Sequence, residues 1–278
     1  MALIYDIGMH TCEDTAFYLH QGHKVVALEA VPSLAEKART RFQREVEEGR
    51  LIVLNCAVAA RAGEMDFWVC DDHSEWSSFN QKVASRNGSR HHSIKVKTAR
   101  FAEILSEFGR PEYLKLDIEG NEHLCLLDLS ERNRPRYVSV EDDGASFNPE
   151  GDPRNLMLLR ECGYERFKLI WQPDFWPLAK SGPYSGFHGI VYRILYSDSL
   201  RIRLIRKLGT RTLASPFDVR SRLERRNQWK FPQSSSGPWG EGTLGRWLTF
   251  SEAREIFHWC RGRSFWRSFW FDWHAKLS

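Results

Sequence analysis

Residues 2–30, ALIYDIGMHTCEDTAFYLHQGHKVVALEA, contain two short apolar runs separated by a segment of helical character. The first run ends at Gly8 and the second covers Lys24–Ala30, and both have the length and composition of buried strands. Gly22 follows the helical segment, and glycine is the residue type that commonly ends a helix. This stretch therefore predicts a strand, a helix and a second strand, the unit from which parallel sheets are built.

The same alternation continues through the first two thirds of the chain. We expect further strands at 51–58, 64–70, 93–98, 112–118, 136–143, 164–171 and 188–196, and helices at 32–42, at 101–108, from 121 onward and at 155–162. Thr11 with Asp14, and Ser33 with Glu36, have the spacing of capping boxes at helix starts. The expected fold is α/β, with a mostly parallel sheet covered on both faces. No helix is expected in 172–187, so the last strand is predicted to be antiparallel.

Charge divides the 278 residues into two unequal parts. Residues 199–278 hold 16 Lys or Arg against 6 Asp or Glu, whereas residues 1–198 hold 24 against 30. We therefore expect two regions: a ligand-binding domain at 1–198, and a basic, Trp-rich helical extension at 199–278 packed on it. Trp266, Trp270 and Trp273 have helical spacing, which favours an amphipathic helix docked on the acidic domain. A polyanion- or membrane-binding surface, or a wall for an acceptor ring, are the alternatives.

The apolar runs, the N-terminal sequence and the cysteines indicate the cellular compartment in which we expect the protein. No apolar run approaches the ~20 residues of a membrane span, and the N-terminus does not resemble a secretory signal. The six cysteines are scattered, with no CxxC pair and no zinc-ligand spacing. These features predict a reducing, cytoplasmic environment.

Polar residues follow several of the expected strands, and ligands of such sheets bind at the carboxyl ends of the strands. Glu29 stands 23 positions after Asp6, close to the offset of about 20 residues at which a carboxylate binds ribose hydroxyls. A dinucleotide fits poorly, because Gly8 is the only glycine of the turn and Glu13 and Asp14 would repel phosphate. S-adenosylmethionine carries a sulfonium and an ammonium group instead, which an acidic turn attracts. The alternative is an ordinary turn whose acids complement the helix dipole.

Further motifs follow in an order that resembles one known family. They are YDIGMHTCEDTAFYL (5–19), VVALEAVP (25–32), LNCAV (54–58), EWSSF (75–79), EYLKLDIEGNE (112–122) and YVSVE (137–141), and SSGPWGEGTLGRW (235–247) is similar to a signature of one branch. On these motifs the chain resembles the FkbM-type S-adenosylmethionine-dependent methyltransferases over nearly its whole length. The resemblance implies a Rossmann-like methyltransferase sheet and, as the usual reaction, O-methylation.

The resemblance also implies roles for individual residues. The implied cofactor contacts are Asp6, Gly8, His10, Glu29, Asn55, Ala57 and Asp117. Among them, Glu29 would hold the ribose, Asn55 and Ala57 would flank the adenine, and Asp117 would lie near the methionine end.

The first loop departs from the family pattern at one position. Such loops usually read Asp-x-Gly-x-x-x-Gly, and Cys12 stands at the second glycine. If the backbone must approach the ligand closely there, Cys12 would weaken cofactor binding. If the position tolerates a small side chain, Cys12 would have no such effect.

Methyl transfer to a hydroxyl requires alignment of the reactants and a general base. The catalytic candidates are Asp117, Glu141 and His188, and Glu119, Glu122 and Asp142 are further carboxylates near the same rim. Carboxylates that gather there raise one another's proton affinity, which suits a base. The bland alternatives are cofactor contact for Asp117, helix N-terminal acids for Glu119 and Glu122, and a structural role for His188.

Two features of the site stay open in the sequence. The carboxylates could hold Mg²⁺ through oxygen ligands, although a metal-free site is favoured. Residues 71–92 lack periodicity and are expected to form a long loop, in which EWSSF either closes over the ligand as a lid or packs locally.

The combined interpretation is an S-adenosylmethionine-dependent methyltransferase that O-methylates a glycan or a small metabolite. One alternative is a nucleic-acid methyltransferase that uses the basic tail, which predicts salt-sensitive binding. Another is a non-catalytic module that keeps the fold, and a nicotinamide dehydrogenase fits least. The sequence does not define the acceptor or the oligomeric state.

Overall fold

The computed structural model describes residues 1–142, 147–179, 219–261 and 270–278. The strands are β1 Leu3–Ile7, β2 Lys24–Leu28, β3 Leu51–Leu54, β4 Ala57–Val58, β5 Gly63–Cys70, β6 His91–Ala99, β7 Tyr113–Leu116, β8 Tyr137–Glu141, β9 Arg166–Trp171, β10 Trp176–Pro177 and β11 Phe271–Lys276. The α-helices are α1 Glu13–His20, α2 Pro32–Arg41, α3 Gln43–Glu47, α4 Gln81–Ala84, α5 Phe101–Phe108, α6 Glu122–Leu127, α7 Arg154–Glu161, α10 Val219–Asn227 and α11 Phe250–Arg261. Short 3-10 turns cover Ser74–Trp76, Arg86–Gly88, Gln172–Asp174 and Gly240–Gly242.

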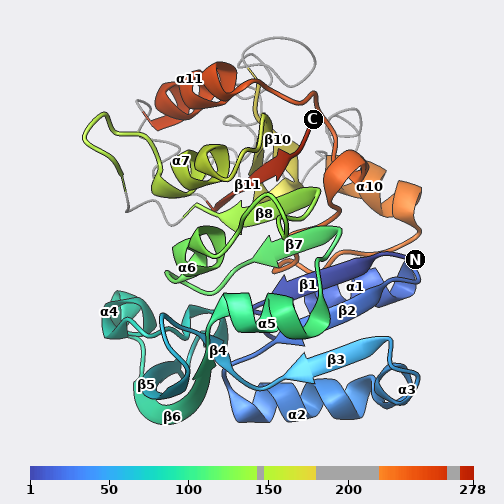
Figure 1. Ribbon diagram of the computed structural model, residues 1–278, viewed down its shortest axis with the longest axis vertical. Coiled ribbons are helices and arrows are strands. Elements are labelled where there is room, and N and C mark those ends of the chain that lie inside the picture. Colours follow the sequence, from blue (N-terminus) through green and yellow to red (C-terminus); the bar gives the residue numbers. More distant parts are fainter. Residues whose placement is uncertain (143–146, 180–218, 262–269) are drawn as a thin grey trace, which may run out of the picture.

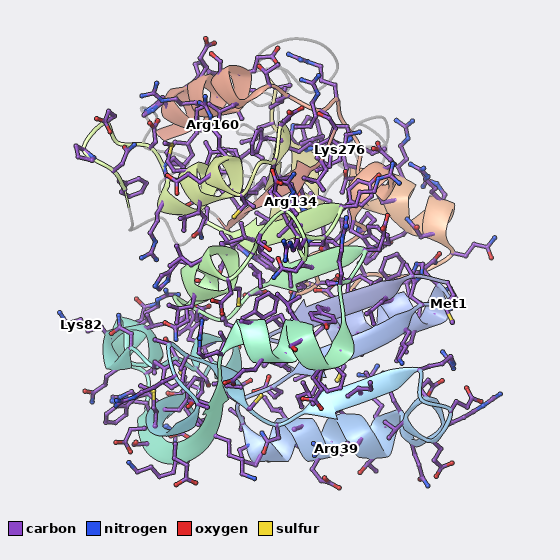
Figure 2. The ribbon with its side chains drawn as sticks, in the orientation of Figure 1. Met1, Arg39, Lys82, Arg134, Arg160 and Lys276 are labelled. Atoms are coloured by element: carbon purple, nitrogen blue, oxygen red, sulfur yellow. The ribbon has the colours of Figure 1, made fainter. Side chains whose placement is uncertain are left out.

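An eight-stranded sheet in the order β10-β9-β11-β8-β7-β1-β2-β3 forms the centre of the protein. The five strands from β8 to β3 are all parallel to one another. Strands β1, β2, β7 and β8 are buried at nearly every position, as expected for parallel strands covered on both faces. Side chains fill the space between sheet and helices, whereas Lys82 on α4 projects outward (Figure 2). The predicted Rossmann-like class is confirmed.

A second, smaller sheet lies beside the carboxyl ends of the parallel strands. It has the order β4-β6-β5, in which β5 and β6 form a long antiparallel pair. In Figure 1 the arrowheads of β1, β7 and β8 point toward the side on which α4, β5 and β6 lie. The expected strand at 51–58 is therefore two strands in different sheets, because the chain leaves the large sheet after Leu54 and enters the small one at Ala57.

The C-terminal end of the chain contributes a strand to the middle of the large sheet. β11 lies between β8 and β9 and is antiparallel to both. The helix predicted through Trp270 and Trp273 is wrong at its end, because Trp273 is a fully buried residue of β11. The apolar positions there alternate as Phe271, Trp273 and Ala275, which is the period of a strand.

The structure thus has an antiparallel strand, β11, that the sequence did not predict. Segment 188–196, in which we expected the antiparallel strand, lies outside the described residues, as do Trp266 and His188. The boundary between 198 and 199 also lies there and stays a prediction.

The two capping boxes expected from the sequence are wrong. Helix α1 follows Cys12, which has a left-handed backbone (φ 68) and no side-chain cap. The carboxylate of Asp14 is instead hydrogen-bonded by the C-terminal part of the chain. Helix α2 begins at Pro32, one residue before Ser33. Proline has no backbone N–H, but the N–H at the first helical position would have no partner within the helix, so proline is well suited there.

A buried histidine on β11 makes the stability of the fold depend on pH. His274 is 1% exposed and pairs in register with Lys168 of β9. Among the residues that the structure describes, neither of its ring nitrogens has a hydrogen-bond partner. Burial and the Lys168 charge lower the pKa of His274 to about 3. Between this value and its ordinary pKa of 6.5, the folded protein binds fewer protons than the unfolded chain, so stability falls as the pH falls.

We expect this group to cost up to about 1.4 kcal/mol of unfolding free energy for each pH unit below 6.5. Urea unfolding at pH 7, 5.5 and 4.5 measures the slope. His274→Leu should flatten it, whereas His92→Leu, at an exposed position, should leave it unchanged. Equal slopes for the wild type and His274→Leu would show that His274 does not stay neutral in the fold.

Candidate active site

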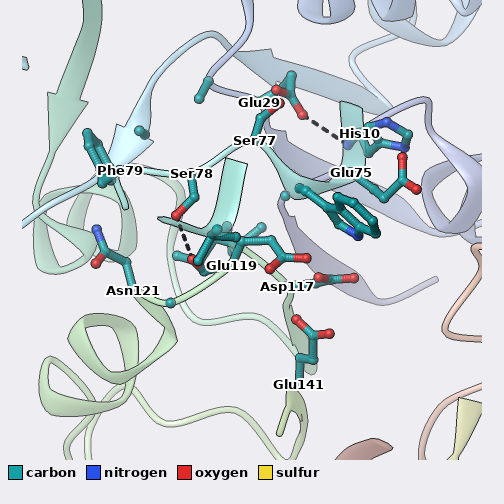
Figure 3. A pocket seen from close by; sticks show the side chains of 18 of the residues that line it. His10, Glu29, Glu75, Ser77, Ser78, Phe79, Asp117, Glu119, Asn121 and Glu141 are labelled. Carbon is teal, nitrogen blue, oxygen red and sulfur yellow. Dashed lines mark hydrogen bonds between the residues drawn. The ribbon is translucent and has the colours of Figure 1, made fainter. Parts of the chain in front are cut away.

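A cavity of about 1330 Å³ opens at the carboxyl ends of the central strands. Its wall consists of residues that follow β1, β2, β7 and β8, together with residues from 67 to 86. The C-terminal part of the chain adds Gln233, Ser234 and Trp270. Figure 3 shows that the carboxyl groups of Asp117 and Glu141 lie close together on one side of this cavity. Asp117 and Glu141, which were both predicted at the carboxyl ends of the strands, therefore lie in one site.

Gly8 closes the turn after β1 in a conformation that only glycine adopts easily. Its φ is +88°, and its N–H, like that of Met9, donates a hydrogen bond to the carbonyl of Leu28. A Cβ atom at Gly8 would lie 1.8 Å from the carbonyl oxygen of Asp117. The absence of a side chain thus lets the ends of β1 and β7 meet at the cavity floor.

Glu29 holds the first loop from the end of β2. Its Oε2 accepts a hydrogen bond from the backbone N–H of His10 at 3.0 Å (Figure 3). Its Oε1 accepts one from the backbone N–H of Val31 at 2.8 Å. Burial raises the pKa of Glu29 to about 7. A carboxylate has about four acceptor sites, so two remain for hydroxyl groups of a ligand. Glu29 lines the cavity, as the ribose-binding role requires.

Asn55 and Ala57 follow β3 at the far end of the cavity. Ala57 lines the cavity itself. Asn55 donates through Nδ2 to the carbonyl oxygens of Glu29 and Ala30, and it lines an adjoining hollow of about 610 Å³. Ala57 can therefore contact a ligand directly, whereas Asn55 shapes the turn beside it.

His10 connects the first loop with the loop after β5. Its Nε2 lies 2.7 Å from Ser74 Oγ, and its Nδ1 lies 3.5 Å from a carboxylate oxygen of Glu13. Burial lowers the pKa of His10, but hydrogen bonding and charge from Glu13, with the charges of Glu29 and Glu75, raise it above its ordinary value. His10 therefore takes up a proton more readily than an ordinary histidine.

Lys115 is a residue of the candidate site that sequence reasoning missed. The lysine stands in the middle of β7, and its Nζ lies 3.3 Å from Asp6, 3.4 Å from Asp14 and 3.4 Å from Asp117. Burial lowers its pKa, but the three carboxylates together raise it well above the ordinary value. The available signal was a single charge inside the apolar strand YLKL.

Asp6 lies beneath the cavity and not on its wall. Its side chain is fully buried, accepts a hydrogen bond from Thr15 Oγ1 at 2.6 Å and contacts Lys115. Burial raises its pKa to about 6, against the opposing effects of Lys115 and Thr15. Asp6 therefore does not contact the cavity directly, and Lys115 connects it with the cavity wall.

Two carboxyl groups near the ends of β8 and β7, those of Glu141 and Glu119, hold protons unusually strongly. Burial, together with the charges of Asp117, Glu119, Glu122 and Asp272, raises the pKa of Glu141 well above its ordinary value. Burial and Asp117 raise that of Glu119 to about 8, although Arg86 lies 3.3 Å from its carboxylate. One side of the cavity can therefore both donate and accept protons near neutral pH.

The loop after β7 is held from two sides. Glu122 accepts hydrogen bonds from the backbone N–H groups of Ile118 and Gly120, and is therefore a local cap. Ser78 Oγ donates to the carbonyl oxygen of Glu119 at 2.7 Å (Figure 3). Glu122 is thus a helix N-terminal acid, the non-catalytic role considered for it, whereas Glu119 lines the cavity.

The segment 71–92 is more ordered than the predicted loop. It contains α4 and the two 3-10 turns Ser74–Trp76 and Arg86–Gly88, and Ser74–Gln81 line the cavity. The hydrogen bonds of Ser74 to His10 and of Ser78 to Glu119 join this segment to both sides of the site. Its closure as a lid stays a prediction.

Cys12 does not obstruct the cavity. Its side chain is 2% exposed, belongs to the apolar core, and lies 3.8 Å from Met9 Sδ. It is not among the residues that line the cavity. Its φ of 68° is a left-handed conformation that a glycine would adopt without strain.

The described ranges contain neither a metal-binding group of side chains nor a membrane-spanning helix. Within residues 1–142, 147–179, 219–261 and 270–278, no group of three or more His, Cys, Asp or Glu side chains has a metal-binding arrangement. In the same ranges no helix is long and apolar enough to cross a membrane. The six cysteines, all within the described ranges, form no disulfide with one another.

The parallel sheet and the acidic cavity at its carboxyl edge define a protein of the Rossmann-like methyltransferase class. The Methyltransferase FkbM domain matches residues 6–166, more than half of the chain. The chain therefore belongs to the FkbM methyltransferase family, and the resemblance noted in its sequence is confirmed.

Several solved structures are similar to this chain at low sequence identity. An FkbM methyltransferase from Methylobacillus flagellatus KT is 13% identical with a TM-score of 0.41, and the match covers 60% of this chain and 39% of that one. A putative sarcosine dimethylglycine methyltransferase from Galdieria sulphuraria is 10% identical with a TM-score of 0.37, and the match covers 99% and 77%. A precorrin-6y C5,15-methyltransferase from Geobacter metallireducens GS-15 is 10% identical with a TM-score of 0.31, covering 66% and 71%. The chain thus spans well under half of the Methylobacillus protein. Among curated proteins no sequence matches it.

Proposed function

We propose that this methyltransferase uses S-adenosylmethionine to O-methylate a hydroxyl group of a glycan or of a small metabolite. The observation that carries the proposal is the acidic wall of the cavity. Carboxyl groups face it from the first loop and from the ends of β2, β7 and β8. Glu13 lies in this wall, and hydrogen bonds lower its pKa to about 2, so its negative charge attracts a cationic cofactor and repels phosphate groups.

The residues present fit this cofactor in its chemistry. Glu29 has two acceptor sites left for the ribose hydroxyls, and Ala57 offers an apolar surface to the adenine. Gly8, His10 and Asp117 line the part of the cavity near the first loop, where the methionine end would lie. When bound, S-adenosylmethionine supplies an activated methyl group.

The chain itself would manage the proton of the acceptor hydroxyl. Burial and the neighbouring carboxylates favour the protonated form of Glu141, which would donate a hydrogen bond to the acceptor. Asp117, fixed 3.4 Å from Lys115, and Glu119 beside it are placed to receive a proton. His188, the third candidate base, lies outside the described residues.

Two other functions predict different behaviour. Exposed Arg222, Arg225 and Arg226 on α10 favour a nucleic-acid substrate, which would bind with a steep salt dependence. A non-catalytic module would leave the cofactor unbound, yet the Cys12 thiol, the feature that first raised this alternative, lies outside the cavity. The acidic wall supports the small-molecule acceptor over both.

Calorimetric titration with S-adenosylmethionine tests the cofactor assignment. We expect binding by the wild type and a loss of at least about tenfold in Glu29→Gln, because a charged acceptor is removed. Asp72→Asn is the control, since Asp72 is outside the cavity and pairs with Arg90. A wild-type protein that does not bind the cofactor would refute the proposal. Labelled-methyl transfer to a panel of glycosides, polyols and RNA then identifies the acceptor class.

A further inference from the structure

A loop from the C-terminal part of the chain contacts the first helix, more than 200 residues earlier. Ser235 Oγ donates to Asp14 Oδ1 at 2.5 Å, and the backbone N–H of Ser236 donates to Asp14 Oδ2 at 3.0 Å. Ser234 Oγ donates to Glu13 Oε1 at 2.9 Å. We call residues 233–237 the serine loop. Both acids at the start of α1 are thus bound by one distant segment.

The serine loop is firmly docked. Ser235 is 0% exposed and Asp14 3% exposed, so their hydrogen bond is shielded from water. Ser235 Oγ also accepts the backbone N–H of Gly237 at 3.0 Å, which closes the turn. Just beyond it, Trp239 stacks on Tyr113 of β7, with ring centroids 4.9 Å apart and an interplanar angle of 6°. These contacts hold the loop against the central sheet.

The same contacts lead directly into the cavity. Asp14 Oδ2 lies 3.4 Å from Lys115 Nζ, and Lys115 lies 3.4 Å from Asp117 on the cavity wall. Glu13 also lines the cavity, as do Gln233 and Ser234 of the serine loop. The loop therefore touches the site in two ways, as part of its wall and as the partner that fixes Asp14.

Hydrogen bonding keeps the Glu13 carboxylate ionised at the cavity. Burial raises the pKa of Glu13, but hydrogen bonds from His10, Thr11 and Ser234 lower it to about 2. A negative charge in this place favours a cationic ligand. The serine loop contributes one of the donors that maintain it.

We propose that the serine loop is a positioning element of the methyl-donor site, so that S-adenosylmethionine binds tightly only when Ser235 is docked on Asp14. The inference rests on the proposed cofactor. The matched family domain ends at residue 166, so the loop lies outside the part of the chain that defines the family. Because coupling between two equilibria is reciprocal, bound S-adenosylmethionine in turn holds the loop down.

Calorimetry with S-adenosylmethionine on Ser235→Ala tests the coupling. We expect binding about tenfold weaker than in the wild type, because Asp14 loses a buried, charge-assisted hydrogen bond. In an Asp14→Asn background the same Ser235→Ala change should have little further effect, as partners in one interaction are non-additive.

Thr243→Val separates coupling from loss of stability. Thr243 is a buried hydroxyl of the same C-terminal region that accepts a hydrogen bond from Lys168 at 2.8 Å, and it does not line the cavity. Its loss should lower the thermal unfolding midpoint and leave cofactor affinity unchanged. An equal loss of affinity in Thr243→Val and Ser235→Ala would show that cofactor affinity falls with the general stability of the fold. That result would overturn the proposal.

Amide hydrogen exchange gives a second readout. S-adenosylmethionine should slow exchange of residues 233–239 in the wild type and not in Ser235→Ala. Wild-type affinity retained by Ser235→Ala, or unchanged exchange in a wild type that binds, would overturn the coupling alone. A wild type that does not bind at all would overturn the proposed function and the coupling with it.

Discussion

Replacement of Lys115 by methionine is expected to lower the free energy of unfolding by about 3–5 kcal/mol, the cost of leaving buried charges without their partner. It should also abolish cofactor binding. Lys115 is the common partner of three carboxylates, of which Asp6 and Asp14 are almost completely buried. Without the ammonium group, these acids either remain charged in an apolar surrounding or take up protons.

The loss should therefore depend on pH. With Lys115 absent, the folded-state pKa of Asp6, already raised to about 6 by burial, rises further above the unfolded value, so the folded variant gains protons as the pH falls. The difference in stability between Lys115→Met and wild type should be large at pH 8 and smaller at pH 5. Urea unfolding at both values measures it.

Lys168→Met is the matched control. Lys168 is also a buried lysine in a strand, but burial lowers its pKa to about 8, and its Nζ is hydrogen-bonded to the neutral hydroxyl of Thr243. Removing a charge that the fold already disfavours should cost much less than removing one that compensates three acids. Similar losses for the two variants would contradict the central role of Lys115.

Local patterns predicted much of the architecture and the position of the site. Helix α5 has the expected bounds, and the apolar runs that end at Gly8 and begin at Lys24 are β1 and β2. Glu29, Asp117 and Glu141 were placed at one rim because parallel strands end on the same edge of a sheet, and all three line one cavity.

Contacts between distant parts of the chain could not be predicted in this way. Whether Lys115 is a surface or a buried charge depends on β7 lying between β1 and β8, and a single strand does not reveal its neighbours. The capping-box prediction for Asp14 failed for the same reason, because Ser235 competes for its carboxylate. The strand nature of Trp273 also depends on pairing with β8 and β9.

Gly8→Ala is expected to have the second large effect, because the position is restricted twice. An alanine there must adopt a φ of +88°, and its Cβ would lie 1.8 Å from the carbonyl oxygen of Asp117. Backbone cannot yield as a flexible side chain does, so the turn after β1 must separate from the end of β7. We expect a loss of about 3–5 kcal/mol in unfolding free energy, and loss of cofactor binding, since both segments form the cavity floor.

Gly22→Ala separates the two restrictions. Gly22 has a φ of +79°, close to that of Gly8, but a Cβ there would meet nothing within 4 Å. Its replacement should cost only the left-handed conformation, roughly 1–2 kcal/mol, and leave cofactor affinity intact. The difference between the two variants then measures the close approach of the strand ends to each other. If Gly8→Ala lost no more stability than Gly22→Ala and still bound the cofactor, the ends of β1 and β7 would not be packed together as described, and the cavity floor built on them would need another explanation.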